Sequence, residues 1–153
     1  MTAKIVFSGA PARDRSVLDS WSTHARKVTG LEAKAESAVG PVVVWHLAAS
    51  NYRVLARSVQ IFDERDDAQR DALAAAAAAA SGQLTPRLVK NGYLGAYGWY
   101  AVVESTPVLT CARWYSTERD RRDSIRIAMA ALVEALPALR DGVATPARTV
   151  GRR

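Results

Sequence analysis

The sequence contains a single cysteine, Cys111, among its 153 residues. One cysteine excludes an intramolecular disulfide and a metal site built mainly from thiolates. Only two histidines are present, His24 and His46, and their separation does not fit metal-ligand spacing. The sequence also lacks a phosphate-binding loop, a dinucleotide-binding fingerprint and a serine nucleophile elbow. We therefore expect no cofactor and no metal, and we favour a non-enzymatic role over an enzymatic one.

Long apolar runs are absent as well. No stretch reaches the roughly 18 apolar residues that a membrane helix needs. The longest candidate, Ala74 to Ala80, is short and weakly hydrophobic. The apolar segment near the N-terminus is too short for a secretory signal. Together with the lone cysteine, these features predict a cytoplasmic protein that does not bind membranes.

The composition that remains is that of a folded globular domain, with 49% hydrophobic and 24% charged residues. The formal net charge is +6 and the pI is near 9.9, with arginine more abundant than lysine. A basic protein attracts polyanions, so nucleic acid is an allowed partner. A coding bias towards alanine and arginine would give the same excess without any binding site.

The order of the expected elements indicates the α+β class. β-branched and aromatic runs bounded by turn residues predict strands at 4–7, 41–49, 54–62, 85–93, 97–104 and 108–115. Apolar residues at helical spacing predict helices at 16–29, 63–81 and 117–136, and the 143–150 region holds one more candidate strand. Residues 31–40 lack a clear period and are expected to be a linker or a frayed helix. Pro137 and the Asp141-Gly142 pair are expected to end the last helix.

Two parts of the chain resemble each other when one is shifted by 54 residues. Trp45 then aligns with Trp99, the Val54-Leu55 pair with Val108-Leu109, and the acidic-basic triplet 64–66 with 118–120. This pattern predicts an internal duplication in which each half supplies part of one shared core. We place the repeats at 41–90 and 91–150 of a single domain, 1–153, with an N-terminal extension over 1–40.

The repeat unit resembles the YegP-like family of small, largely uncharacterised proteins, over roughly residues 41–150. The resemblance depends on Trp99, Val108-Leu109, Tyr115 and Ile125 in the second half, and on Trp45, Leu47, Asn51, Val54-Leu55 and Ile61 in the first half. It implies two tandem β-β-β-α-β units that form one antiparallel sheet with the helices on one face. It also implies that the strand after each helix is exchanged between the halves. The predicted N-terminal helix is an addition to the two repeat units. The resemblance implies no reaction and no catalytic residues.

One candidate site is basic and aromatic. Arginines cluster around an aromatic pair where the last strand turns into the last helix, and the residues concerned are Arg113, Trp114, Arg119, Arg121, Arg122 and Arg126. Aromatic side chains can stack on bases and arginines can hold phosphates. Acidic residues are interleaved with these arginines and could pair with them. Strand alternation places Trp114 and Tyr115 on opposite faces, so at most one of them is free to stack.

We therefore expect a non-enzymatic binding or adaptor protein whose partner is an unidentified protein or nucleic acid. The alternative is an enzyme or small-ligand binder with a site between the repeats, using His46, Tyr100 and Cys111. A homodimer formed through an open sheet edge is a third possibility. The helix that carries Trp21 could bind a partner or simply pack on the sheet. The acidic residues at 63–71 fit the first turn of a helix better than a metal site.

Overall fold

The computed structural model describes residues 3–10, 16–30, 41–93, 95–142 and 148–149. The elements follow the order β1 (Lys4–Ala10), α1 (Ser16–Thr29), β2 (Val42–Ala48), β3 (Val54–Ser58), α2 (Arg65–Ala80), β4 (Thr85–Asn91), β5 (Ala96–Val103), β6 (Thr106–Cys111), α3 (Glu118–Arg140) and β7 (Arg148–Thr149). The protein is therefore an α+β protein, as the sequence predicts. The expected linker at 31–40 lies outside the described residues.

The strands form one sheet with the order β4-β5-β6-β3-β2-β1-β7. β1 to β3 form one antiparallel meander and β4 to β6 form another. The two meanders meet where β3 pairs with β6, with Arg57 opposite Thr110 at the centre of the ladder. The short β7 pairs in parallel with β1. β4, which follows α2, pairs with β5, and β7, which follows α3, pairs with β1.

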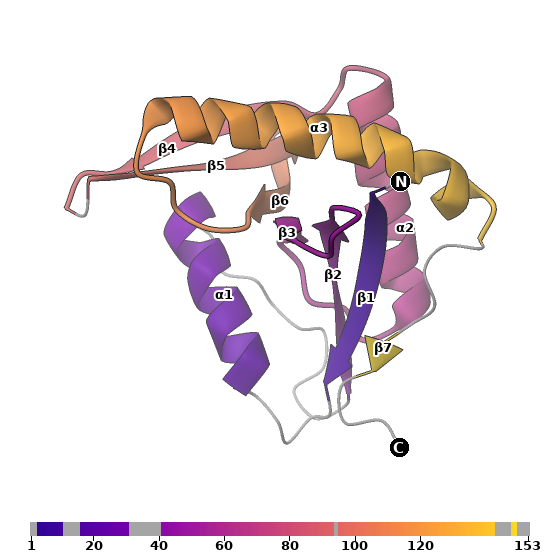
Figure 1. Cartoon of the computed structure of the whole chain (residues 1–153). Helices are drawn as coiled ribbons and strands as arrows, with labels where there is room; N and C mark the ends of the chain where they lie inside the picture. The colour runs from indigo at the N-terminus through magenta and orange to yellow at the C-terminus, as the bar shows by residue number, and fades with distance from the viewer. Residues whose placement is uncertain (1–2, 11–15, 31–40, 94, 143–147, 150–153) are drawn as a thin grey trace.

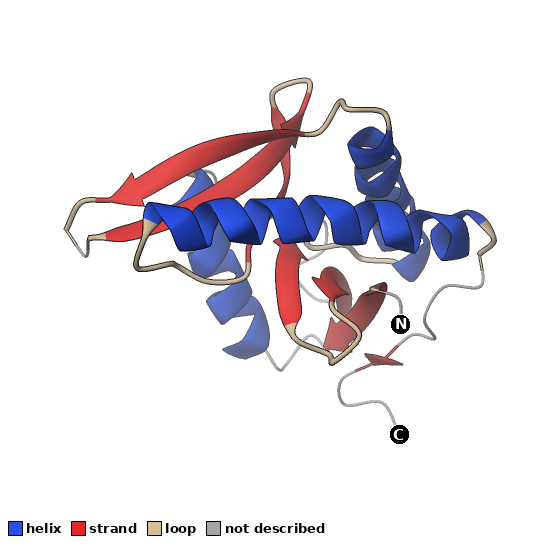
Figure 2. Ribbon diagram, turned by 45° about the horizontal axis from the view of Figure 1, so that its top comes forward, coloured by secondary structure: helices blue, strands red, loops and turns tan. Residues whose placement is uncertain are grey.

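α2 and α3 cover one face of the sheet, and α1 covers the other. Figure 2 shows α3 in front of the sheet and α1 behind it. The indoles of Trp45 and Trp99 are fully buried beneath the helix pair. Trp45 Nε1 donates to Asp71 of α2 at 2.8 Å, and Trp99 Nε1 donates to Ser124 of α3 at 2.9 Å.

The position of α1 decides between the two roles considered for Trp21. Its Nε1 donates to the backbone oxygen of Ser58 at 2.7 Å, and its ring packs beside Val42, Val44 and Ile61. Ala25 and Val28 of the same helix are also buried. α1 therefore uses its apolar face to cover the sheet.

α2 packs against the sheet and α3 through small side chains. Its buried residues are all alanines: Ala68, Ala72, Ala75, Ala76 and Ala78. Because alanine adds little bulk, the backbones of neighbouring elements can come close to α2. Much of the apolar composition therefore contributes close packing rather than large buried side chains.

α3 continues through Pro137, contrary to the prediction, and ends at Arg140, directly before the predicted Asp141-Gly142 stop. Proline removes one helical N–H and so frees the carbonyl four residues earlier, at Val133. Val133 is exposed, so water can hydrate that carbonyl. The helix ends where the backbone N–H groups of Asp141 and Gly142 bond to Pro137 and Leu139.

The two halves make matching contacts. Phe62 pairs with Val43 in one half, and Tyr115 pairs with Tyr97 in the other. The Trp45 N–H donates to Ser58 Oγ, whereas the Trp99 N–H donates to Cys111 Sγ. The first strand of each pair matches at a shift of 54 residues, but positions after the hairpin turn match at 53. The 54-residue alignments of Val54-Leu55 with Val108-Leu109 and of the acidic triplets are thus wrong by one position, because the first hairpin turn is longer. The duplication itself stays a prediction.

Within the described residues, no helix is both long enough and apolar enough to cross a membrane.

Candidate functional site

The tip of the β4–β5 hairpin and the first turns of α3 lie at the same end of the molecule (Figure 1). Contacts join the two elements: Arg121 of α3 donates to the backbone oxygen of Val89 in β4 at 3.1 Å. The Arg121 guanidinium also lies 5.1 Å from the centre of the Tyr97 ring. This end contains most of the residues that the sequence indicated as a nucleic-acid site.

Three of the predicted arginines are available for binding. Arg113, Arg119 and Arg122 are exposed, and in the described part of the chain none of them forms an ion pair. Arg126 is also exposed, but its guanidinium lies 3.7 Å from the Asp123 carboxylate. The predicted site therefore retains three unpaired guanidiniums at its surface.

Arg121 is not a surface residue, contrary to what the sequence suggests. Its side chain is 8% exposed, and its guanidinium lies 3.5 Å from the Glu118 carboxylate as well as against Val89. Helical spacing points Arg121 towards β4, and its long stem crosses the apolar gap to reach the strand. Arg121 joins α3 to the sheet, so it cannot neutralise a phosphate.

Trp114 also has a structural contact that the sequence did not indicate. Its ring lies over Gly98, so close that a Cβ at that position would stand 2.7 Å from a ring carbon. Tyr115 turns the other way, and its hydroxyl accepts a hydrogen bond from Ser124 of α3 at 2.8 Å. The two aromatics thus point to opposite faces, as predicted, but both are half-buried and neither offers a free face for stacking.

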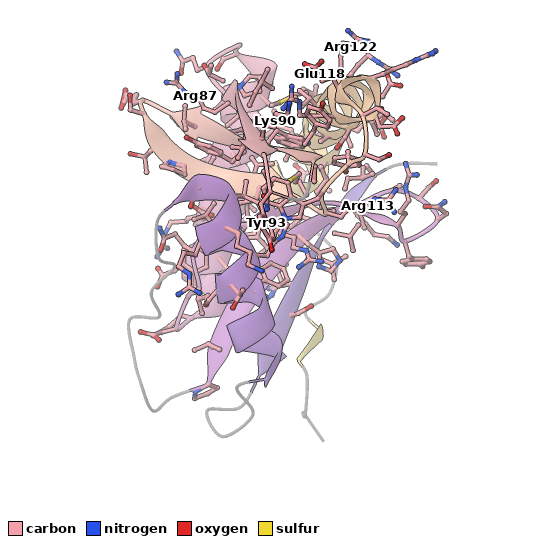
Figure 3. All side chains as sticks on the ribbon, turned by 90° about the vertical axis from the view of Figure 1, so that its left-hand side faces the viewer. Arg87, Lys90, Tyr93, Arg113, Glu118 and Arg122 are labelled. Carbon is pink, nitrogen blue, oxygen red and sulfur yellow. The ribbon has the colours of Figure 1, made fainter. Side chains whose placement is uncertain are left out.

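The freest aromatic side chain at this end is one that sequence reasoning missed. Tyr93, at the hairpin tip, is 96% exposed. Arg87 and Lys90 of the adjoining edge strand are exposed too. Figure 3 looks at this end and shows these three residues with Arg113 and Arg122. The Asn91-Gly92 turn signal could have located Tyr93, because a residue next to a hairpin turn is held away from the core.

Two of the exposed cations at this end lie over tyrosine rings. Lys90 Nζ lies 5.3 Å from the centre of the Tyr97 ring, and the Arg113 guanidinium lies 5.6 Å from that of Tyr115. Cation–π contacts of this kind hold long side chains in place at a surface. We call the end of the molecule that carries Arg87, Lys90, Tyr93, Arg113, Arg119 and Arg122 the basic-aromatic end. Arg87 and Lys90 lie on opposite faces of β4.

The three residues considered for the alternative site, His46, Tyr100 and Cys111, do not come together. His46 pairs across the sheet with Arg57, and Cys111 pairs with the preceding residue, Ala56. Consecutive strand residues point to opposite faces, so the imidazole and the thiol lie on opposite sides of the sheet. Burial raises the pKa of the Cys111 thiol, which disfavours the thiolate. Tyr100 shares the face of His46, but these residues do not form a nucleophile and base pair.

Both histidines have structural settings. His24 Nε2 donates to the backbone oxygen of Cys111 at 2.7 Å, which attaches α1 to β6. Burial lowers the pKa of His24 and of His46, and the positive charge of Arg57 lowers both further. Both shifts favour the neutral imidazole, although the hydrogen bond to Cys111 raises the pKa of His24 and so acts against its shift.

The acidic residues near the start of α2 are used in separate contacts. Asp67 pairs with Arg70, and Asp71 accepts the hydrogen bond from Trp45. Burial raises the pKa of Asp71, although this hydrogen bond acts in the opposite direction. The residues that the structure describes contain no group of three or more histidine, cysteine or acidic side chains that could hold a metal ion.

Comparison with solved structures identifies the architecture. The solution NMR structure of yegP from E. coli, described as a protein of unknown function, superimposes with a TM-score of 0.53. The match covers 78% of this chain and 91% of that chain, at 11% sequence identity. The fold is YegP-like. No family model and no curated protein matches the sequence. The YegP-like fold therefore explains the sheet and its helices, and it carries no information about function.

Proposed function

We propose that this protein is a non-enzymatic binding protein and that the basic-aromatic end binds single-stranded nucleic acid. The observation that carries the proposal is the exposure of Tyr93, a nearly free aromatic ring on a hairpin tip between basic side chains. An exposed tyrosine has no packing role, and its ring can stack on an unpaired base.

The surrounding charges suit a phosphate backbone. Arg87, Lys90, Arg113 and Arg122 are exposed on elements that meet at this end. Arginine and lysine that neutralise phosphates release counterions, which makes binding strongly dependent on salt. Glu118 lies at the same end, but its carboxylate is 3.5 Å from the buried Arg121, so much of its charge is already balanced.

A single strand fits this end better than a duplex. At this end a hairpin tip projects beside the first turns of α3 (Figure 1). The bases of a single strand can turn towards Tyr93, whereas those of a duplex are stacked inside it. We also infer that the protein acts in a reducing compartment, the cytoplasm, where a lone thiol such as Cys111 stays reduced.

Fluorescence anisotropy with a mixed-sequence single-stranded RNA and a duplex DNA, at low and at near-physiological salt, tests this proposal. We expect the RNA to bind more tightly and its affinity to fall steeply with salt. Tyr93→Ala should weaken binding by about 5- to 150-fold, the range measured for loss of one stacked base. Replacing Arg87, Lys90 and Arg122 together by Gln should reduce the salt dependence.

Arg140→Gln is the control, because Arg140 is exposed at the last residue of α3, whereas the basic-aromatic end lies at the first turns of this helix. The control should leave most of the affinity intact. An absence of RNA binding even at low salt would overturn the proposal. Equal losses in the control and in the Arg87, Lys90 and Arg122 variant would show only a general attraction of a basic protein for RNA.

A further inference from the structure

A pocket of about 500 Å³ opens between the two halves of the molecule. It lies where the β3–β6 ladder stops at the Ala56–Cys111 pair. Beyond this pair the two strands separate below the N-terminal half of α3. The first half contributes Arg53, Val54, Leu55 and Arg57, whereas Ala112, Arg113, Tyr115 and residues of α3 come from the second half. Its volume falls within the range of small-molecule sites, about 300 to 1,000 Å³.

Three arginines line this pocket: Arg53, Arg57 and Arg113. None of them forms an ion pair with a carboxylate in the part of the chain that the structure describes. Arg57 is also half-buried, with its guanidinium over the Trp21 ring at 5.3 Å. A guanidinium that has lost part of its hydration and has no carboxylate partner favours the binding of an anion beside it.

The other half of the molecule provides an internal comparison. At the shift of 53 residues that the matching contacts define, Arg53 corresponds to Thr106, Arg57 to Thr110 and Arg113 to Gln60. All three counterparts are uncharged. The scaffold therefore does not require arginine at these positions, and the three charges are a property of this pocket.

Two carboxylates line the pocket as well as the arginines. Asp120 and Asp123 lie on α3 and line the same space. Asp123 is 3.7 Å from Arg126, while Asp120 forms no ion pair in the described chain. A simple anion would meet repulsion from these two residues. A ligand that also carries hydroxyl or amino groups could donate hydrogen bonds to these carboxylates.

We propose that this pocket binds a small organic anion, whose phosphate or carboxylate contacts Arg53, Arg57 and Arg113 and whose hydroxyl or amino groups contact Asp120 and Asp123. This site is separate from the basic-aromatic end, and the two surfaces share only Arg113. Both halves of the chain contribute to the pocket, so it exists only when β3 and β6 are paired.

Isothermal titration calorimetry with three probes tests the proposal. Ribose 5-phosphate carries hydroxyl donors, L-glutamate carries an amino donor, and inorganic phosphate serves as the anion without a carbon skeleton. We expect at least one of the first two probes to bind with one-to-one stoichiometry and at least tenfold more tightly than inorganic phosphate. If neither binds, or if inorganic phosphate binds equally well, the proposal is overturned.

Variants assign the binding to the pocket. Arg57→Gln should weaken the organic probe by about tenfold or more, because a hydrogen bond to a charged group is lost. Arg53→Gln keeps the test decisive if the Arg57 variant does not fold, since Arg53 is exposed. Asp120→Asn should weaken the organic probe but strengthen inorganic phosphate. Unchanged affinity in Arg53→Gln and Asp120→Asn would overturn the site.

Two matched variants separate this proposal from the nucleic-acid proposal. Arg119→Gln removes an exposed arginine of α3 that does not line the pocket, and Tyr93→Ala removes the stacking side chain. Both should leave binding of the organic probe unchanged, whereas Arg53→Gln should leave RNA binding unchanged. Loss of probe binding in Arg119→Gln would indicate general electrostatic attraction and overturn the pocket.

Discussion

The indole Nε1 of Trp99 donates a 2.9 Å hydrogen bond to the hydroxyl of Ser124. That hydroxyl in turn donates to Tyr115 at 2.8 Å, so one serine connects β5, α3 and the segment between β6 and α3. The corresponding tryptophan, Trp45, donates to the carboxylate of Asp71 instead. Each large helix is thus attached to the sheet by one buried indole, with a neutral acceptor in one half and an ionisable acceptor in the other.

Ser124→Ala should destabilise the protein by about 1 to 3 kcal/mol, because it leaves the N–H of a fully buried indole without an acceptor. Urea unfolding followed by tryptophan fluorescence measures the change. Ser116→Ala is the control, since Ser116 is exposed. A loss below about 0.5 kcal/mol, comparable to surface substitutions, would contradict the structural role of this hydroxyl.

Asp71→Asn should raise the free energy of unfolding at pH 7. Burial raises the pKa of Asp71, so ionisation of this carboxyl is less favourable in the folded protein than in the unfolded chain. The amide oxygen of asparagine can still accept the hydrogen bond from Trp45. A raised folded pKa costs stability as the pH rises through it, so the gain should shrink towards pH 4. Urea unfolding of the unchanged protein and of the Asp71→Asn variant at pH 4 and pH 7 measures the difference. A variant that is less stable than the unchanged protein at pH 7 would contradict the prediction.

Gly98→Ala should destabilise the protein by about 1 to 3 kcal/mol through overpacking, because the new methyl group would overlap the Trp114 ring. Gly92→Ala is the matched control, since a Cβ there meets nothing within 4 Å. In a Trp114→Ala background the same change should cost much less, which a double-mutant cycle on thermal or urea unfolding would show. Additive effects would mean that the ring moves aside freely.

The stability of the protein should decrease in mild acid. The pKa values of His24 and His46 are lowered in the folded state, whereas the unfolded chain titrates near 6.5. The unfolded state therefore binds protons first, and stability falls as the pH falls below about 7. Each histidine can contribute a slope of up to about 1.4 kcal/mol per pH unit. The His24→Gln, His46→Gln double variant should flatten the profile of unfolding free energy between pH 7 and pH 5; an unchanged profile would assign the slope to other groups.

The sequence predicts the elements well, because their signals are local. The helix predicted over 117–136 is recovered in α3, and the strands predicted at 85–93 and 97–104 are recovered in β4 and β5. The Tyr115 and Trp114 side chains point to opposite faces, as strand alternation requires. α2 is harder to orient from sequence, because nearly uniform alanine gives no contrast between its buried and exposed sides.

The site is predicted less well, because its residues are brought together by contacts between distant elements. An arginine in a charged helix turn is expected to be exposed to solvent. Arg121 instead contacts Val89 of β4. Likewise, Arg53 and Arg113 are 60 positions apart in the chain and share a pocket only because β3 pairs with β6. Nothing in the neighbourhood of either residue indicates that pairing.

The β3–β6 ladder also has a consequence for the order of folding. It pairs Ala56 with Cys111, whereas the hairpins β2–β3 and β5–β6 join residues close in sequence. Closing a long loop costs more chain entropy than forming a hairpin, so non-local pairing is slow. We expect each meander to form early and the central ladder to form last. The pocket between the halves would then be completed in the final step, and a ligand held there would slow unfolding by keeping the two meanders together.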